Sequence, residues 1–406
     1  MFLVVLSLLS LSAITPGVSP DSQAIETRDE LASLTASPAA MMQHAGEPIP
    51  SNAELVARER ESKAWFTARM QGIQRGSDDC AVGSIWLHQF EDIVALSSSP
   101  DHNPTRFVYI DASAPVGGDG TSWNAAFQSL QDALENAEFN YDSEIVEFRV
   151  AGGVYRADRV NGVDTLDPDL SIELPGLTWN GTRFVGVKSL KGGYAGRGAK
   201  NPDERNIELY PTLFTGDLLG DDTEDYENYA DNTKILFLPN QTELNGITIE
   251  HARIAAYEAR WMTDCTVRWC FADSSIPVAE STASPVYALN ARVVGCSFDR
   301  NRGDRFGGAL KPEGFVVVAN SRFTRNCAPT GGAIGSRYSF GDDGATLIVQ
   351  NCYFGENAAD SAQGGSGGAV ANFRIAPERS QFVHCTFAGN RAVDGGGMLR
   401  SVHRVR

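Results

Sequence analysis

CSFDRNRGDRFGGAL, residues 296–310, is the first of four copies of one short pattern that lie between Cys296 and Met398. Each copy has a Phe, an Asn three residues later, and then a glycine pair. The Phe residues are 25, 31 and 33 residues apart. A fixed pattern at a nearly fixed period is typical of a solenoid, in which each repeat stacks on the next. The four copies are Phe298/Asn301/Gly307-Gly308, Phe323/Asn326/Gly331-Gly332, Phe354/Asn357/Gly367-Gly368 and Phe387/Asn390/Gly395-Gly396.

Each copy predicts two short strands joined by a sharp kink. An apolar, β-branched run comes first, and a Cys-x-Phe or Ser-x-Phe pair follows, whose two members share one face of a strand. The residue between run and pair is of a type that tolerates positive φ, so we expect a left-handed kink there. Helical repeats would need a period of 3.6 residues and fewer glycines. The four kink residues are Gly295, Asn320, Asn351 and His384.

Stacking of such coils in parallel at about 4.8 Å places like residues over like residues. We therefore expect an internal stack of the four Phe rings and a ladder of the four Asn amides, which bond one another and the turn backbone. The glycine pairs would form tight corners, without a Cβ to meet the next coil. A column of small buried groups is expected from Cys296, Ser321, Cys352 and Cys385.

The paired FxxN and GGA[ILV] repeats resemble those of the polymorphic outer-membrane proteins and of related bacterial right-handed parallel β-helix proteins. The resemblance covers about the last quarter of the chain. It implies an all-β fold, a right-handed parallel β-helix of the pectin-lyase-like type. It also implies display at the outer membrane or cell surface and a role in adhesion.

Three regions are predicted along the chain. Residues 1–19 are expected to be a signal peptide, because 2–14 is apolar but too short to span a bilayer reliably. Residues 20–105 are rich in Ser, Ala, Glu and Pro and then in helix formers, which predicts a disordered and helical region. Residues 106–406 are expected to be the β-helix, which ends within a coil and is therefore expected to be incomplete at the C-terminus.

The first part of the folded region predicts a strand and a covering helix. Residues 107–110 form the strand, and a helix over the first coil would close the open end of the core. The segment from Tyr109 to Leu134 also resembles the first segment of many bacterial β-helix proteins. Apolar residues at helical spacing are Trp123, Phe127, Leu130 and Leu134. Further strands are predicted at 145–150, 184–186, 235–238 and 246–250, with a degenerate repeat around Cys265.

Charge and cysteine content narrow the class of protein. The formal net charge of −17 argues against nucleic acid and anionic membrane as partners. The seven Cys are an odd number without a CxxC pair, so no zinc or thioredoxin-type site is indicated. The Cys residues at the repeat position are expected to be buried as small apolar groups. Bridging stays open for Cys265, Cys270 and Cys327.

Two stretches outside the repeats carry ion-binding residue types. The glycine run 191–196 favours a tight corner over a phosphate loop, because no GK[ST] follows it. Seven acidic residues crowd one loop, and hard cations such as Ca²⁺ favour oxygen-rich loops, although the spacing fits no EF-hand. A Ca²⁺ site and a solvated loop both stay open, so no cofactor is predicted. The acids are Asp217, Asp221, Asp222, Glu224, Asp225, Glu227 and Asp231.

Polysaccharide lyases and glycoside hydrolases share this fold, so an enzyme is the alternative to a binding protein. Glycoside hydrolysis needs two carboxylates about 5–10 Å apart. The acids of the repeats lie at unmatched repeat positions, and the His and basic elements of a polygalacturonase-like site are missing. These acids are Asp299, Asp304, Asp342, Asp343, Glu356 and Asp360. Arginines that are expected to be solvated, or to pair with acids across coils, are Arg300, Arg302, Arg305, Arg322 and Arg325.

No catalytic residue is predicted, because no GxSxG elbow is present and no His lies near a Ser or Cys nucleophile pattern. The sequence predicts a secreted or cell-surface scaffold that binds without catalysis. A polysaccharide lyase or glycoside hydrolase is the alternative. A rigid repeat array with variable loops suits extended recognition. The expected partner is an extracellular polysaccharide or a surface protein, and membrane association is expected only through export or outer-membrane display.

Overall fold

Short strands make up most of the regular structure, and nearly all of them pair in parallel. The structure is a computed structural model that describes residues 103–136, 144–176, 178–179, 184–223, 226–273, 284–336, 346–360, 365–373, 380–393, 396 and 399–402. The predicted signal peptide and nearly all of the region 20–105 lie outside these residues. The expectation of an all-β fold with parallel sheets is confirmed.

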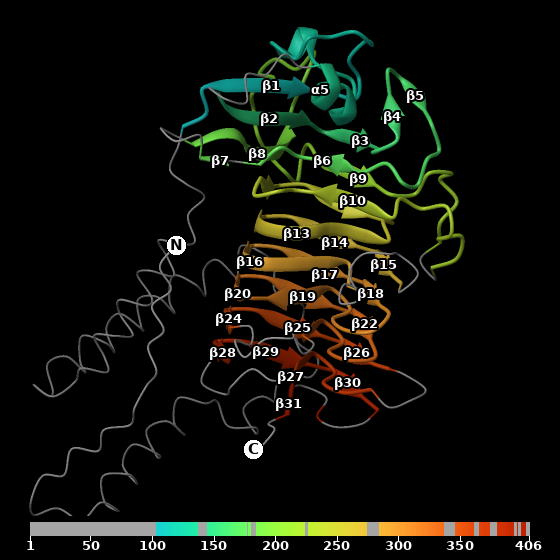
Figure 1. Cartoon of the computed structure of the whole chain (residues 1–406), viewed down its shortest axis with the longest axis vertical. Helices are drawn as coiled ribbons and strands as arrows, with labels where there is room; N and C mark the ends of the chain where they lie inside the picture. The colour runs from blue at the N-terminus through green and yellow to red at the C-terminus, as the bar shows by residue number, and fades with distance from the viewer. Residues whose placement is uncertain are drawn as a thin grey trace, which may run out of the picture. The chain divides into compact units, whose positions relative to one another are not determined.

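The largest sheet contains sixteen strands, and its main path follows the chain from β1 to β31 (Figure 1). That path is β1 (Arg106–Ile110), β2 (Ile145–Ala151), β8 (Phe184–Tyr194), β11 (Glu243–Asn245), β13 (Ile254–Thr263), β16 (Val286–Val294), β19 (Leu310–Glu313), β23 (Ile334–Ser336), β27 (Val370–Phe373) and β31 (Leu399–Val402). Strands off the path are β6 (Ile172–Glu173), β7 (Thr178–Trp179), β10 (Ile235–Leu238), β20 (Phe315–Ala319), β24 (Thr346–Gln350) and β28 (Ser380–Val383).

Two further parallel sheets run alongside, and each takes one strand from successive repeats. The second sheet contains β3 (Gly153–Tyr155), β9 (Thr212–Thr215), β12 (Thr248–Glu250), β14 (Thr266–Arg268), β17 (Ser297–Asp299), β21 (Arg322–Thr324), β25 (Tyr353–Gly355) and β29 (Thr386–Ala388). The third contains β15 (Phe271–Ala272), β18 (Arg302–Gly303), β22 (Cys327–Ala328), β26 (Ala358–Ala359) and β30 (Arg391–Ala392). The antiparallel pairs are β7 with β8, and β4 (Arg159–Val160) with β5 (Val163–Asp164).

Equivalent residues of successive repeats are direct strand partners. Phe298 pairs with Phe323, Phe323 with Phe354, and Phe354 with Phe387. Their rings stack with centroids 4.7, 4.9 and 4.8 Å apart and planes within 7° of parallel. The first three rings are fully buried. The predicted aromatic stack is therefore confirmed.

The predicted left-handed kinks are confirmed at all four positions. Gly295, Asn320, Asn351 and His384 have φ between 52° and 65°. Each kink turns the chain from the large sheet into the second sheet, as between β20 and β21. The side chain of Asn351 donates to the Asn320 carbonyl oxygen Oδ1 at 2.9 Å, so the kinks also bond one another.

The four repeat Asn side chains form the predicted ladder. Each Nδ2 donates to Oδ1 of the next Asn, at 3.0 Å from Asn301 to Asn326, 3.0 Å from Asn326 to Asn357, and 2.9 Å from Asn357 to Asn390. Each Nδ2 also donates to a backbone carbonyl of the preceding repeat, such as Phe298 O. The first three are fully buried, so the ladder satisfies amides that would otherwise be costly to bury.

The glycine corners leave no room for a side chain. A Cβ on Gly308 would lie 2.1 Å from Gly332 O, and a Cβ on Gly332 would lie 2.1 Å from Gly368 O. The preceding glycines Gly307, Gly331 and Gly367 have φ of 62–68°. Both halves of the predicted corner are confirmed in the first two repeats and the positive φ is confirmed in the third, whereas most of the fourth corner lies outside the described residues.

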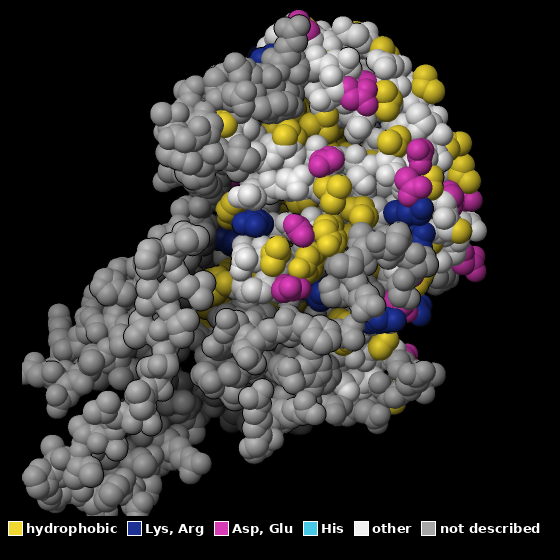
Figure 2. All heavy atoms as spheres, viewed as in Figure 1, with side chains coloured by type: hydrophobic (Ala, Val, Ile, Leu, Met, Phe, Trp, Pro, Cys, Tyr) yellow, Lys and Arg dark blue, Asp and Glu magenta, His cyan; other side chains and the backbone are white. Residues whose placement is uncertain are grey.

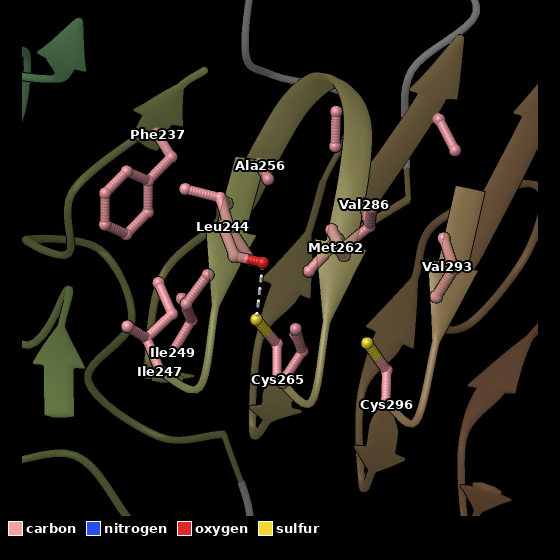
Figure 3. Packing of buried hydrophobic residues seen from close by; sticks show 14 of the residues in the cluster. Phe237, Leu244, Ile247, Ile249, Ala256, Met262, Cys265, Val286, Val293 and Cys296 are labelled. Atoms are coloured by element: carbon pink, nitrogen blue, oxygen red, sulfur yellow. Dashed lines mark hydrogen bonds between the residues drawn. The ribbon is translucent and has the colours of Figure 1, made fainter. Parts of the chain in front are cut away.

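The cysteine column lines the core beside the apolar residues (Figure 3). Cys265, Cys296 and Cys352 are buried, and Cys265 Sγ contacts Leu244 O at 3.3 Å. The six cysteines within the described residues are free, including Cys270 and Cys327, for which bridging had stayed open. Around Cys265, β14 pairs with β12 and β17, which confirms the degenerate repeat predicted there.

The expected N-terminal helix is shorter than predicted. The α-helix α5 spans Leu130–Asn136, and Trp123 lies in the 3-10 turn η2 (Trp123–Ala125). The reason is that Phe127 pairs with β1 as a strand residue would, donating to Tyr109 O at 3.0 Å. The helix begins only where Ser129 Oγ accepts from Asp132 N at 3.0 Å. Its buried residues Leu130 and Ala133 join the same apolar cluster as the strands.

The glycine run 191–196 was expected to be a corner, but Gly192 and Gly193 lie inside the eleven-residue strand β8. Gly193 has a φ of 88°, and the register to β2 shifts beside it, so the strand bends there without ending. A Cβ on Gly192 would lie 2.7 Å from Gly246 O, so the backbone of the neighbouring chain segment leaves room only for glycine at position 192.

Candidate functional site

The acids and arginines of the repeats pair across neighbouring coils. Asp299 closes β17, and both of its carboxylate oxygens accept from Arg325, at 2.7–2.9 Å, one repeat later. Thr324 Oγ1 donates to the same carboxylate at 2.6 Å. The prediction that repeat arginines pair with acids across coils is confirmed for Arg325. Both oxygens of this carboxylate are thus engaged by Arg325 and Thr324, so Asp299 is a structural partner in the array.

A second column of left-handed residues precedes the Asn ladder and was not predicted. We call it the kink column; its φ values lie between 48° and 56°. Arginine, tryptophan and glutamate seldom adopt this conformation, so residue type gave no signal. In the sequence, these residues can be recognised only by their position directly before a ladder Asn, or before the residue that takes the place of that Asn in the earlier repeats. The kink column is His251, Trp269, Arg300, Arg325 and Glu356; Gly389, with a φ of 64°, holds the same position before the fourth ladder Asn.

Aromatic and cationic groups stack along the first part of the kink column. The His251 ring lies 5.5 Å from the Trp269 ring at an interplanar angle of 25°. The guanidinium groups of Arg268 and Arg300 lie 4.5 and 5.8 Å from the Trp269 ring centre. Such contacts hold arginines in fixed orientations at a surface. Figure 2 shows basic and acidic side chains close together along one margin of the molecule.

The acidic loop, residues 217–233, connects β9 to β10 and is anchored on the kink column. Tyr226 donates its hydroxyl hydrogen to Arg300 O, and Tyr229 donates its own to Trp269 O. Burial raises the pKa of both tyrosines, so they remain neutral donors at ordinary pH. These bonds hold one side of the loop against the backbone of two neighbouring repeats.

A buried carboxylate holds the other side of the loop. The side chain of Asp222 is fully buried, and its Oδ2 lies 3.1 Å from His251 Nδ1 and accepts from Asn232 Nδ2 at 2.5 Å. Asn232 Nδ2 also donates to His251 O at 2.6 Å. His251 is one of two histidines in the described part of the chain, and its ring contacts an acid, Tyr229 and Trp269. Its contacts are therefore those of a loop anchor, and none is to a serine or cysteine nucleophile.

Three of the seven predicted acids converge. Asp217, Asp221 and Asp231 each place one carboxylate oxygen within 4.8 Å of the other two. Burial raises the pKa of Asp231, and the charges of Asp221, Asp222 and Asp217 raise it further. Asp222 faces His251 as described above, Glu227 is exposed, and Glu224 and Asp225 lie outside the described residues.

A second polar group lies on the outer face of the first strands of the large sheet. Strand alternation turns Phe107 and Tyr109 of β1, and Glu147 and Arg149 of β2, to the same face, and register places Arg149 beside both Tyr109 and Lys191. We name this group the Arg149 cluster. Its members are Phe107, Tyr109, Trp123, Glu147, Arg149, Lys191, Tyr194 and Asp203.

The Arg149 cluster is rigid and internally paired. The guanidinium of Arg149 lies 3.7 Å from the Phe107 ring centre and 5.5 Å from that of Tyr194. It donates to Glu147 at 3.1 Å and to Asp203 at 3.2 Å, and Trp123 Nε1 donates to the same Asp203 oxygen at 3.1 Å. Lys191 Nζ lies 2.6 Å from Glu147, so the lysine of the glycine run is engaged with a carboxylate.

Two of the remaining repeat acids hold the same repeat position: Asp304 and Asp360 each lie three residues after a ladder Asn, two repeats apart. Glu356 lies in the same repeat as Asp360 but directly before the ladder Asn, so the expectation of unmatched positions is wrong for Asp304 and Asp360. Asp342 and Asp343 lie outside the described residues. Glu147 and Asp203 of the Arg149 cluster both pair with Arg149.

Comparison with protein-family models, curated proteins and solved structures gave no match. Within the described residues, no helix has both the length and the apolar character that crossing a membrane requires.

Proposed function

We propose that residues 106–402 form a right-handed parallel β-helix whose first coil is covered by α5. The support is that successive repeats give one strand to each of three parallel sheets, in register, with stacked Phe and Asn columns inside. Right-handed connections are the rule between parallel strands of one sheet. Leu130 of α5 packs in the same apolar cluster as Ile110 of β1, as a covering helix would.

We further infer that this β-helix is a binding scaffold without catalysis, secreted or displayed at the cell surface. Its partner would be an extracellular polysaccharide or a surface protein. The single observation that carries the proposal is the Arg149 cluster. It combines buried, oriented aromatic rings with an arginine, the residue types that dominate recognition hot spots.

Part of the Arg149 cluster is accessible to a partner. Phe107 is 37% exposed, and the side chains of Lys191 and Asp203 are 28% and 56% exposed. Trp123 and Tyr194 are each 6% exposed and fix the base of the cluster. A surface with a rigid base and an accessible rim loses little conformational entropy on binding. The carboxylates are already paired with Arg149, which favours recognition over acid–base chemistry.

A ligand panel with and without Ca²⁺ tests this proposal on the full chain. Uronate polymers, neutral polysaccharides and surface proteins are assayed both for binding and for sugar release or unsaturated products. We expect saturable binding to at least one ligand without turnover. Release of sugar or of unsaturated products would instead establish the polysaccharide enzyme, and absence of all binding would contradict the scaffold.

Matched arginine variants locate the binding surface. Arg149→Lys keeps the charge but loses the planar stacking on Phe107, so we expect binding to weaken about tenfold or more. Arg391→Ala removes an exposed arginine on β30, distant in the strand order, and should leave affinity unchanged. Equal affinity of wild type and Arg149→Lys would show that the Arg149 cluster is not the binding surface.

A further inference from the structure

We propose that the acidic loop binds Ca²⁺, with Asp217, Asp221 and Asp231 as carboxylate ligands and Asp222 and Asn232 as sources of further oxygen. The inference is independent of the binding function proposed above. It begins from the three carboxylate oxygens that lie within 4.8 Å of one another. Clustered acids alone do not make a site, so the buried oxygens beside them carry the inference.

Asp222 supplies the decisive observation. Its side chain is fully buried, yet Oδ1 has no hydrogen-bond partner among the described residues. Two hydrogen bonds hold Asp222 beside the acid group, one through its backbone and one through its carboxylate. The backbone amide of Asp222 donates to Asp217 Oδ2 at 3.2 Å, and its Oδ2 accepts from Asn232, the residue after Asp231.

Two further buried oxygens in the same loop are also without a donor. Oδ2 of Asp231 and Oδ1 of Asn232 are buried and unpartnered among the described residues, and Asn232 as a whole is fully buried. Burial of an unpaired acceptor costs about 1–3 kcal/mol, and burial of an unpaired charge costs more. Three such oxygens within eleven residues indicate a missing positive partner, because a cation satisfies several acceptors at once.

The charges at this place point the same way. The carboxylates of Asp217, Asp221 and Asp231 make no ion pair with Lys or Arg within the described part of the chain, whereas Asp222 faces only His251. The three carboxylate oxygens lie within 4.8 Å of one another, so their negative charges repel one another. Mutual repulsion of this kind is relieved by a divalent cation.

Ligand chemistry selects Ca²⁺ among the common cations. All of the donors are oxygens, which excludes the sulfur and nitrogen preference of zinc. Ca²⁺ accepts about 6–8 oxygen ligands in irregular geometry, whereas Mg²⁺ demands a near-ideal octahedron, so an irregular loop of this kind suits Ca²⁺ better.

Bound Ca²⁺ would fasten the loop to the kink column. Asp222 bonds both the acid group and His251, and Tyr226 and Tyr229 of the same loop bond the backbone of Arg300 and Trp269. Occupation of the site would thus order the aromatic and cationic stack beside it. The site is a structural one in this proposal, and no reaction is assigned to it.

Calorimetric titration of the full chain with Ca²⁺, after treatment with EGTA, tests the proposal. We expect one saturable site with a dissociation constant of about 10⁻⁴–10⁻³ M, the range of extracellular calcium modules. Tb³⁺ serves as a second probe, because Tyr226 and Tyr229 in the loop should sensitise its emission, and added Ca²⁺ should reverse that emission. Absence of saturable binding up to 10-fold above about 10⁻³ M would overturn the site.

Single substitutions make the test specific. Asp221→Asn and Asp231→Asn remove one ligand charge each; Asp221 is exposed, and Asp231 Oδ2 has no hydrogen-bond partner among the described residues. We expect each to weaken Ca²⁺ binding at least tenfold, with unchanged circular dichroism in EGTA. Glu208→Gln removes an exposed charge outside the loop and should bind as wild type does. Equal weakening by Glu208→Gln, or unchanged binding in both Asp variants, would contradict the assignment.

Discussion

The ring of Phe323 lies on the ring of Phe298 with centroids 4.7 Å apart and planes 4° from parallel, although 25 residues separate them in the chain. The two residues are direct partners in neighbouring parallel strands. Face-to-face rings at the strand spacing occur where identical side chains repeat at each level of a stacked sheet. The same pairing recurs between each repeat and the next.

Truncation of Phe323 should destabilise the stack from its middle. The ring is fully buried and contacts the rings of Phe298 and Phe354. We expect Phe323→Ala to lower the free energy of unfolding by about 3–5 kcal/mol and Phe323→Leu by about 1–2 kcal/mol. Urea unfolding followed by circular dichroism measures both. Equal and negligible effects would mean that the rings do not form part of a packed core.

Replacement of Asn326 by Asp should be severe despite the equal size of the side chains. The Asn326 Nδ2 donates to Asn357 and to Phe298 O, and a carboxylate can donate to neither. We expect a loss of about 3 kcal/mol or more, because a buried charge and unpaired acceptors are created. Urea unfolding at pH 7 checks it.

A matched control exists at Asn206, which is exposed and only accepts, from Glu208 N and Leu209 N at 3.0 Å each. Asn206→Asp keeps both bonds and should change stability by no more than about 0.5 kcal/mol. A similar loss in the two variants would show that the ladder geometry is not the cause.

The glycine corner should not accept a methyl group. In Gly308→Ala the new Cβ would lie 2.1 Å from Gly332 O and 2.5 Å from Cys327 N. We expect a loss of about 3 kcal/mol or more through backbone displacement. Gly117→Ala has a positive φ but open space around the Cβ, and strain alone should cost about 1 kcal/mol. Thermal unfolding of the two variants separates lack of space from strain, and the reverse order would contradict close stacking.

The core cysteines should resist alkylation while the protein is folded. Burial raises the pKa of Cys270 to about 12 and holds the pKa of Cys296 and Cys352 well above the usual thiol range. About one Cys270 thiol in ten thousand would then be ionised at pH 8, and the thiolate is the reactive form.

Iodoacetamide labelling at pH 8 with peptide mass spectrometry measures this protection. Cys270 should be labelled only in urea, whereas partly exposed Cys327 should react sooner. The sign of the pH effect follows from the raised folded-state pKa. The buried, protonated thiol of Cys270 contributes fully to the free energy of unfolding at pH values below the thiol pKa of the unfolded chain, about 8.5. This contribution is lost as pH rises from that value toward the higher pKa of the folded state. Rapid labelling of Cys270 in the native protein would contradict its burial.

The repeats could be predicted in detail because one local pattern specifies every contact column. Phe298 and Asn301 predict their own neighbours, since stacking places the equivalent residue of the next repeat above each of them. The kink residues, such as Asn320, were identified because their residue types favour positive φ. The second set of left-handed residues, the kink column, was missed because residues such as Arg300 and Arg325 do not favour positive φ. Their conformation follows only from their position directly before a ladder Asn.

The first half of the fold could not be predicted to the same depth because it lacks a repeated pattern. Phe107 and Arg149 are in contact because of the register between β1 and β2, and no local feature of the sequence predicts that register. At Phe127 a local pattern was present but gave the wrong element. Its spacing from Leu130 predicted a helix, whereas the residue pairs with β1. Among the acids of the loop, spacing alone did not distinguish Asp222, which is buried against His251, from the three that converge.

The central claim is that successive repeats stack as parallel coils one strand apart, and an electron–electron distance measurement tests it most directly. Thr248, Tyr353 and Thr386 lie in one column of outward-facing strand positions, with Thr266, Ser297 and Arg322 between the first two. Spin labels attached through unnatural amino acids should be about 19 Å apart for the 248/353 pair and about 24 Å apart for the 248/386 pair. An increment of about 5 Å between the two pairs confirms the stack. Equal or unrelated separations would contradict it.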